Sequence, residues 1–139
     1  MKQVTKLLLR KGAVFLAYLI LLGIGNLIPV QDQYYSMIIG FLNTNTIWIF
    51  LFALFFASAE ALKMTKVPYI IGYPIANAFG TFFLIRFMFS LAYLIDETFG
   101  LKFLFSGYET TTYAVVIIAV LAMGYFKVWR QSAGKKEDR

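Results

Sequence analysis

The sequence predicts an all-α integral membrane protein in which four transmembrane helices form an antiparallel up-down bundle, with both termini in the cytoplasm. Composition is the first observation: 60% of the 139 residues are hydrophobic and 14% are charged, whereas soluble domains have roughly 45–50% and about 25%. The second is that the apolar residues gather in four long runs separated by short polar connections. The third is that Lys and Arg residues are concentrated at the chain ends and in the middle connection, and are few in the other two connections, as expected for a multi-pass membrane protein.

The first run, 13–30, follows a basic segment that contains Lys2, Lys6, Arg10 and Lys11. A helix over this run would be about 27 Å long, close to the hydrocarbon thickness of about 30 Å. A basic start before an apolar run is also typical of a signal peptide, but this run is long for the apolar part of one. We therefore expect a transmembrane helix, with a short interfacial helix ahead of it.

The second and third runs, 46–62 and 69–95, are expected to form a transmembrane hairpin, because the short turn between them carries two lysines. The polar stretch 31–45 is expected to break the chain before the second run. Its apolar patch would lie at the membrane interface or form an early, tilted turn of the next helix. The third run is longer than a bilayer needs and contains Pro74, so we expect tilt, a kink or protrusion into the headgroups.

The fourth run, 113–129, follows an acidic connection over 96–112, whose short apolar patch, 103–105, is expected to rest on the membrane surface. Residues 130–139 form a charged tail. The N-terminal segment, the hairpin turn and the tail hold most of the Lys and Arg residues, and the first connection holds none. The sequence therefore predicts one four-helix domain over 1–139 in the cell (plasma) membrane. By the positive-inside rule, both termini and the hairpin turn lie in the cytoplasm.

The hairpin has small residues at every fourth position: Ala53, Ala57 and Ala61 in its first helix, and Gly72, Ala76 and Gly80 in its second. Lipid tails provide no hydrophobic drive for helix association, so helices associate where small side chains let their backbones approach. The two triplets lie at matching depths near the turn. This pattern predicts packing between the two helices, and a dimer contact through one of the stripes is the alternative.

Arg86 is the first candidate for a functional residue, because an arginine inside an apolar run is costly unless it finds a partner or water. It is expected in the outer part of the third helix. One interpretation is anchoring, in which the side chain reaches lipid phosphates or one of the nearby acids Asp96, Glu97 and Glu109. The other is a role in binding an anion, a lipid headgroup or a partner protein.

Glu60 lies within the second run, about one turn from its cytoplasmic end. Its depth differs from that of Arg86 by about 20 Å at 1.5 Å per residue, so a direct ion pair between them is not expected. We expect Glu60 to pair with Lys63 or Lys66 instead. If no cation reaches it, a buried carboxyl group at this depth would take up a proton and serve as a proton carrier.

Asn26 and Asn77 are the other strongly polar residues within the runs. Such asparagines more often form hydrogen bonds between helices than contact a substrate. A further interpretation is that Gly72 and Pro74 break the third helix and free carbonyl groups for an ion, as discontinuous helices do in transporters.

The residue types that are missing narrow the function. The chain has no His and no Cys, so the usual zinc and haem ligands are lacking, and we predict no metal and no cofactor. The net charge of +6 lies at the ends of the apolar runs, which favours an anionic membrane surface over nucleic acid as the partner.

Three functions are compatible with the sequence. The first is a non-catalytic accessory or structural subunit that binds the lipid bilayer or other membrane protein subunits, in a larger assembly or a homo-oligomer. The second is a small oligomeric channel or transporter, anion-selective or proton-coupled, that uses Arg86 and Glu60. A membrane-embedded enzyme is the least favoured, because P-loop, G-x-G-x-x-G and G-x-S-x-G signatures are absent and no catalytic residue is predicted.

Overall fold

The computed structural model describes residues 2–29, 31–65, 69–100 and 107–137. They form four long helices, α1 (Lys2–Leu27), α2 (Gln33–Lys63), α3 (Gly72–Phe99) and α4 (Glu109–Glu137), with a 3₁₀ turn, η1 (Tyr69–Ile71), leading into α3. No strand occurs within these ranges. All four helices are long and apolar enough to cross a membrane, by length and composition. The predicted all-helical chain with four long apolar helices is therefore confirmed.

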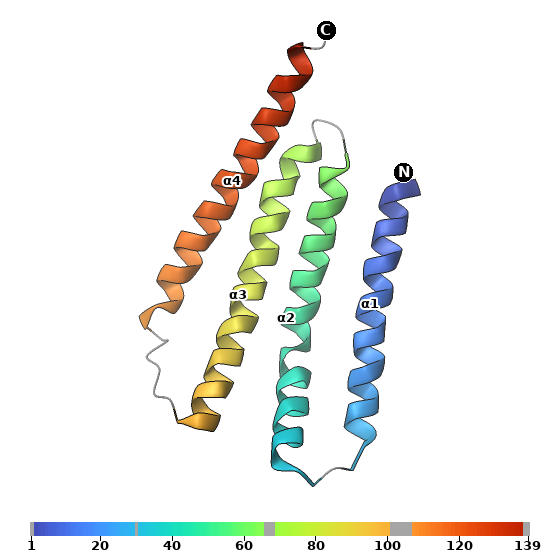
Figure 1. Ribbon diagram of the computed structural model, residues 1–139, viewed down its shortest axis with the longest axis vertical. Coiled ribbons are helices and arrows are strands. Elements are labelled where there is room, and N and C mark those ends of the chain that lie inside the picture. Colours follow the sequence, from blue (N-terminus) through green and yellow to red (C-terminus); the bar gives the residue numbers. More distant parts are fainter. Residues whose placement is uncertain (1, 30, 66–68, 101–106, 138–139) are drawn as a thin grey trace.

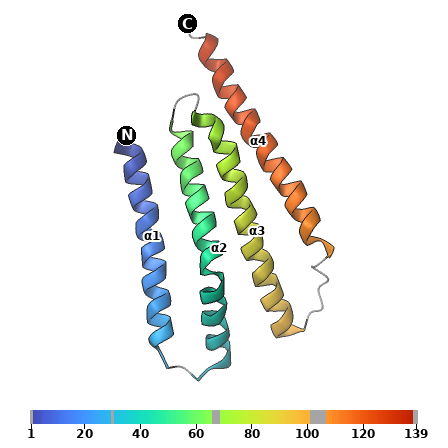
Figure 2. The same cartoon turned by 180° about the vertical axis from the view of Figure 1, so that it is seen from behind.

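The four helices lie side by side in chain order and form an open antiparallel bundle, one helix thick (Figure 1). Both chain ends and the α2–α3 turn lie at one end of the molecule, which we call the terminal end; the α1–α2 connection lies at the opposite end (Figure 2). The main contacts join consecutive helices: α1 with α2, α2 with α3, and α3 with α4. Consequently α1 and α4 form the two edges of the row.

The helix α2 begins earlier than the sequence predicts. The polar stretch 31–45, expected to break the chain, is helical from Gln33 onward. Asp32 precedes this helix in an extended conformation, and its side chain accepts a hydrogen bond from the backbone N–H of Tyr35 at 2.8 Å. An aspartate in this position satisfies one of the unpaired N–H groups of the first turn, which explains why the helix starts here.

Several polar side chains inside α2 form hydrogen bonds with its own backbone. The Thr44 hydroxyl donates to the Gly40 carbonyl at 2.9 Å, and the Asn45 amide donates to the Phe41 carbonyl at the same distance. Asn45 is buried. Because each side chain bonds to the carbonyl four residues earlier, these residues are accommodated within a continuous helix rather than ending one.

The outer two helices also extend beyond their predicted limits. The basic segment before residue 13 continues directly into α1 from Lys2, so it is not a separate interfacial helix. The helix α4 begins at Glu109 and continues to Glu137, through most of the predicted tail. The patch at 103–105 lies outside the described residues.

The helix α3 continues through Pro74 without interruption. Pro74 lies in the first turn, where its missing N–H would have no partner within the helix, so a proline is tolerated there. It is also almost completely buried. The helix ends at Gly100, whose φ of 62° is left-handed and whose N–H donates to the Asp96 carbonyl at 2.8 Å. Glycine adopts this conformation without strain.

The α2–α3 contact pairs glycines with large side chains. A Cβ on Gly80 would lie 2.8 Å from the ring of Phe56, and one on Gly72 would lie 3.3 Å from Leu62. Next to the first of these contacts, Phe55 of α2 stacks on Phe79 of α3, with ring centroids 5.2 Å apart. The close approach of the two helices therefore depends on large side chains of α2, Phe56 and Leu62, that lie over the glycines of α3.

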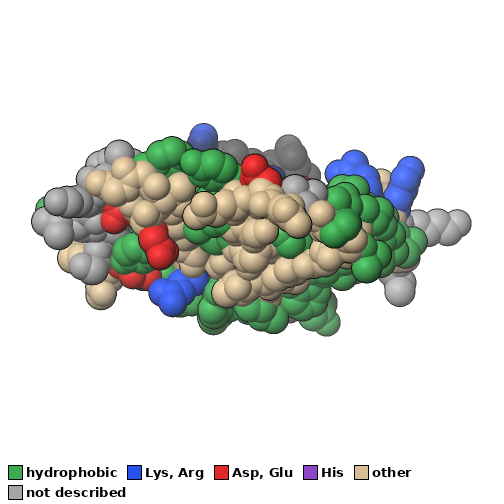
Figure 3. Space-filling view, turned by 90° about the horizontal axis from the view of Figure 1, so that it is seen from below, with side chains coloured by type: hydrophobic (Ala, Val, Ile, Leu, Met, Phe, Trp, Pro, Cys, Tyr) green, Lys and Arg blue, Asp and Glu red, His purple; other side chains and the backbone are tan. Residues whose placement is uncertain are grey.

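Little of the apolar surface is covered by this thin arrangement. Most large hydrophobic side chains of the four helices are at least partly exposed. In a view from the end opposite the terminal end, hydrophobic side chains reach the surface on both broad faces of the row (Figure 3). Exposed apolar area of this extent in a single chain indicates a surface that lipid or protein covers.

Candidate functional site

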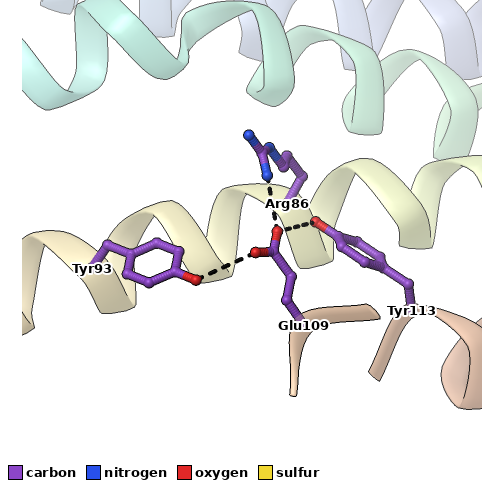
Figure 4. A network of polar contacts seen from close by, with 4 residues as sticks. All are labelled: Arg86, Tyr93, Glu109 and Tyr113. Atoms are coloured by element: carbon purple, nitrogen blue, oxygen red, sulfur yellow. Dashed lines mark hydrogen bonds and ion pairs between the residues drawn. The ribbon is translucent and has the colours of Figure 1, made fainter. Parts of the chain in front are cut away.

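The most connected polar site of the described residues surrounds Glu109, the first residue of α4 (Figure 4). Arg86 of α3 donates through Nη1 to Glu109 Oε1 at 2.8 Å, which is also an ion pair. The Tyr113 hydroxyl donates to the same oxygen at 3.2 Å, and the Tyr93 hydroxyl donates to Oε2 at 3.3 Å. Both carboxylate oxygens are thus engaged. We call these four residues the Glu109 network.

Helix periodicity explains how the Glu109 network assembles. Tyr93 follows Arg86 by seven residues, so the two side chains lie on one face of α3, and Tyr113 follows Glu109 by four on one face of α4. A carboxylate at the first position of a helix also interacts favourably with the helix dipole. The network therefore consists of two side chains from each helix, which meet at the start of α4.

The position of Arg86 shows that α4 is displaced along α3. Arg86 lies in the middle of α3, yet its partner Glu109 is the first residue of α4. Figure 1 shows the result: α4 begins partway along α3 and extends beyond the α2–α3 turn at the terminal end. Because of this displacement, a carboxylate from the start of one helix reaches the central part of its neighbour.

Arg86 also contacts α2. Its guanidinium lies 5.9 Å from the centroid of the Trp48 ring, within the range of a cation–π interaction. The Arg86 side chain remains 47% exposed and that of Glu109 20% exposed. Arg86 of α3 therefore contacts both neighbouring helices at one level of the row, α2 through Trp48 and α4 through Glu109.

Glu60 pairs with Lys11 of α1, at 3.1 Å, rather than with Lys63. Lys66, the other expected partner, lies outside the described residues. The two side chains of the pair are 43% and 47% exposed. The expected contact with Lys63 does not form, because α1 packs beside α2 and brings Lys11 to Glu60. Glu60 and Arg86 are not paired with each other.

Asn26 takes part in a reciprocal amide pair with Asn43 of α2. Each Nδ2 donates to the other's Oδ1, at 3.1 and 2.7 Å. Nearby, the Tyr35 hydroxyl donates to the Gly25 carbonyl at 2.7 Å. Together with the Lys11–Glu60 pair, these bonds connect α1 to α2 at two separate levels.

The remaining candidates lie apart from these polar contacts. The Asn77 side chain, half-buried on α3, forms no hydrogen bond with another described residue. The backbone carbonyl of Asn77 accepts one from the Thr81 hydroxyl at 2.9 Å. Ala76 is buried on α3. On α2, Ala53 and Ala57 line a cavity between α1 and α2, and Ala61 is half-buried.

That cavity has a volume of about 470 Å³. Its lining is apolar except for Lys11 and the hydroxyl of Tyr18. Because the cavity lies beside the Lys11–Glu60 pair, it combines an apolar interior with a charged margin. Sequence reasoning missed it, and the small residues Ala53 and Ala57 were the signal that could have indicated it.

The Tyr93 and Tyr113 hydroxyls were also missed, although their spacing from Arg86 and Glu109 would have placed them on shared helix faces. Within the described ranges, no three His, Cys, Asp or Glu side chains come together to hold a metal ion. No protein-family model, curated protein or solved structure matches the chain. Its function is therefore inferred from the contacts above.

Proposed function

We propose that the four helices cross the cell membrane, with both termini and the α2–α3 turn in the cytoplasm. Three features support this placement: the length and apolar composition of the helices, the exposed apolar side chains on both faces, and the basic residues near the terminal end. Lipid would cover the apolar faces, and cytoplasmic loops of membrane proteins are enriched in Lys and Arg.

Within this membrane, the chain is a non-catalytic accessory or structural subunit that binds lipid or partner membrane proteins. One observation carries this proposal: the charge of Arg86 is neutralised within the chain by Glu109, whose other hydrogen bonds come from Tyr93 and Tyr113. A charge-assisted contact of this kind between two helices holds them in register. Arg86 therefore serves the structure of the row.

The shape of the molecule supports the same function. Four helices in a single row expose two broad apolar faces, whereas a closed bundle would bury its core between them. The edge helices α1 and α4 each have one main neighbour. Partner helices therefore have access to both faces and to both edges.

The test is the native mass of the chain, extracted in mild detergent from its own membrane at its native level. We expect a particle that contains other membrane proteins, or further copies of the chain, in a fixed ratio. A variant with Arg86→Leu and Glu109→Leu serves as a comparison, because it removes both charges of the network together. A wild-type chain that is recovered alone would contradict the accessory function.

The alternative is a small oligomeric channel or transporter. It is favoured by one observation, that the Arg86 side chain stays 47% exposed at mid-helix despite its ion pair. In an oligomer this guanidinium could line an anion path, with Glu60 as a proton site. Ion flux into liposomes that falls in Arg86→Ala and Glu60→Gln would favour this function, and the absence of any flux would eliminate it. A membrane-embedded enzyme stays the least favoured class.

A further inference from the structure

A groove of about 470 Å³ lies between α1 and α2. Small residues leave this space open: Gly12 on α1, and Ala53 and Ala57 on α2. Aromatic rings of Phe15 and Phe50, with centroids 5.1 Å apart, form part of its lining. Its walls therefore offer hydrocarbon and ring faces to whatever occupies it.

The groove is long and apolar. Its α1 wall runs from Leu8 to Tyr18, a length of about 15 Å at 1.5 Å per residue. Its volume of about 470 Å³ lies within the range of about 300–1,000 Å³ of pockets that hold small ligands. An extended hydrocarbon chain can lie along an apolar groove of this length and volume.

The charges at the groove favour an anionic headgroup. Among its described lining residues, Lys11 alone is charged, and its side chain stays 43% exposed beside Glu60. Three further cations near the same end of α1 and α2 are exposed, namely Lys6, Arg10 and Lys63. These cations outnumber the one carboxylate, and basic residues at a membrane surface attract anionic lipids.

We propose that the groove between α1 and α2 binds one acyl chain of an anionic phospholipid, with the phosphate of its headgroup at Lys11. This inference rests on the proposed membrane location and names the lipid that the chain would bind. The acyl chain lies along the groove against Phe15 and Phe50. The Lys11 ammonium donates to the phosphate while it also contacts Glu60, since an ammonium has three N–H donors.

The test measures lipid retained by the full chain. The protein is reconstituted in equal parts of phosphatidylglycerol and phosphatidylcholine and extracted in mild detergent, and bound lipid is counted by native mass spectrometry. The blocking variant is Gly12→Leu, because Gly12 lines the groove and a Cβ there meets no atom within 4 Å, which leaves room for the longer side chain. The matched control is Gly23→Leu, on the same helix, equally open and outside the groove.

We expect the wild type and Gly23→Leu to retain phosphatidylglycerol in preference to phosphatidylcholine, and Gly12→Leu to retain several-fold less. A second variant, Lys11→Gln with Glu60→Gln, leaves the groove open and removes the charged pair. It should retain lipid and lose most of the preference for phosphatidylglycerol. Circular dichroism checks that every variant keeps its helical content.

Three results would overturn the lipid site: equal retention of both lipids by the wild type, unchanged phosphatidylglycerol in Gly12→Leu, or an unchanged preference in the charge variant. A Gly12→Leu effect on the mass of a protein complex, without an effect on lipid, would assign the groove to a protein partner and also overturn the proposal. Each of these results leaves the accessory function itself intact, because that function is measured by the native particle.

Discussion

Gly124 of α4 lies so close to Pro74 of α3 that a Cβ on Gly124 would be 2.7 Å from the Pro74 Cβ and 3.1 Å from its Cα. Pro74 has a rigid ring in the first turn of α3, and both residues are buried. This contact and the Arg86–Glu109 ion pair hold α4 against α3 at two levels. The α3–α4 interface therefore combines a steric contact near the start of α3 with an electrostatic contact near its middle.

The first prediction concerns the steric contact. We expect Gly124→Ala to destabilise the chain by about 1–3 kcal/mol, because the added methyl group overpacks a contact that the proline ring cannot relieve. The measurement is the free energy of unfolding in detergent micelles, followed by circular dichroism. Gly23→Ala is the control, since its Cβ would meet no atom within 4 Å; its stability should be unchanged or slightly raised. Equal stability of the two variants would contradict the interpretation of this contact.

The second prediction concerns the ion pair. Arg86→Leu and Glu109→Leu should each cost about 1–3 kcal/mol, because each leaves a charged partner without its counterion. The double variant should cost less than the two single variants added together. A double-mutant cycle of unfolding free energies measures this coupling, which we expect to be about 0.5–3 kcal/mol for residues in contact. Strict additivity would mean that the pair contributes nothing to stability.

The third prediction concerns the tyrosines of the Glu109 network. Tyr93→Phe and Tyr113→Phe each remove one hydrogen bond to Glu109, with an expected loss of about 0.5–1.5 kcal/mol in unfolding free energy. Tyr125→Phe is the matched control, since Tyr125 is exposed on the same helix as Tyr113 and lies outside the network. If all three variants behave alike, the network does not stabilise the chain.

The fourth prediction concerns topology. The chain has no cysteine, so one introduced at Lys63 or at Gly107, both exposed, gives a unique label. The proposed orientation places Lys63→Cys on the cytoplasmic side and Gly107→Cys on the outer side. A membrane-impermeant thiol reagent applied to intact cells should label Gly107→Cys and should label Lys63→Cys only after permeabilisation. Labelling of both from outside would overturn the orientation.

The sequence was sufficient for the four long helices, because each contains an apolar run of spanning length. It was less informative about where α2 begins. Asp32, Asn43 and Asn45 suggested a polar break, yet Asp32 caps the helix and Asn45 bonds to the backbone of its own helix. The identity of a polar residue does not reveal whether its hydrogen bonds end a helix or lie within it.

The polar partners were harder to predict than the helices. Glu109 was one of three acids considered for Arg86, and only the displacement of α4 along α3 selects it. The partner of Glu60 was sought among the lysines that follow it, but Lys11 comes from a different helix. Such choices depend on which helices are neighbours and on their relative register, and neither is encoded in the spacing within a single run.

The displacement of α4 along α3 has a consequence for how the molecule would sit in a bilayer. Its apolar stretch, Glu109–Arg130, is not level with that of its neighbour, Tyr69–Phe99. The hydrophobic belt around the row is therefore oblique to the helix axes, and a flat bilayer matches an oblique belt only if the helices lean. In the proposed placement, the contacts of Arg86 and Pro74 with α4 would contribute to this lean, so a change at either position would alter the angle of the row to the membrane normal.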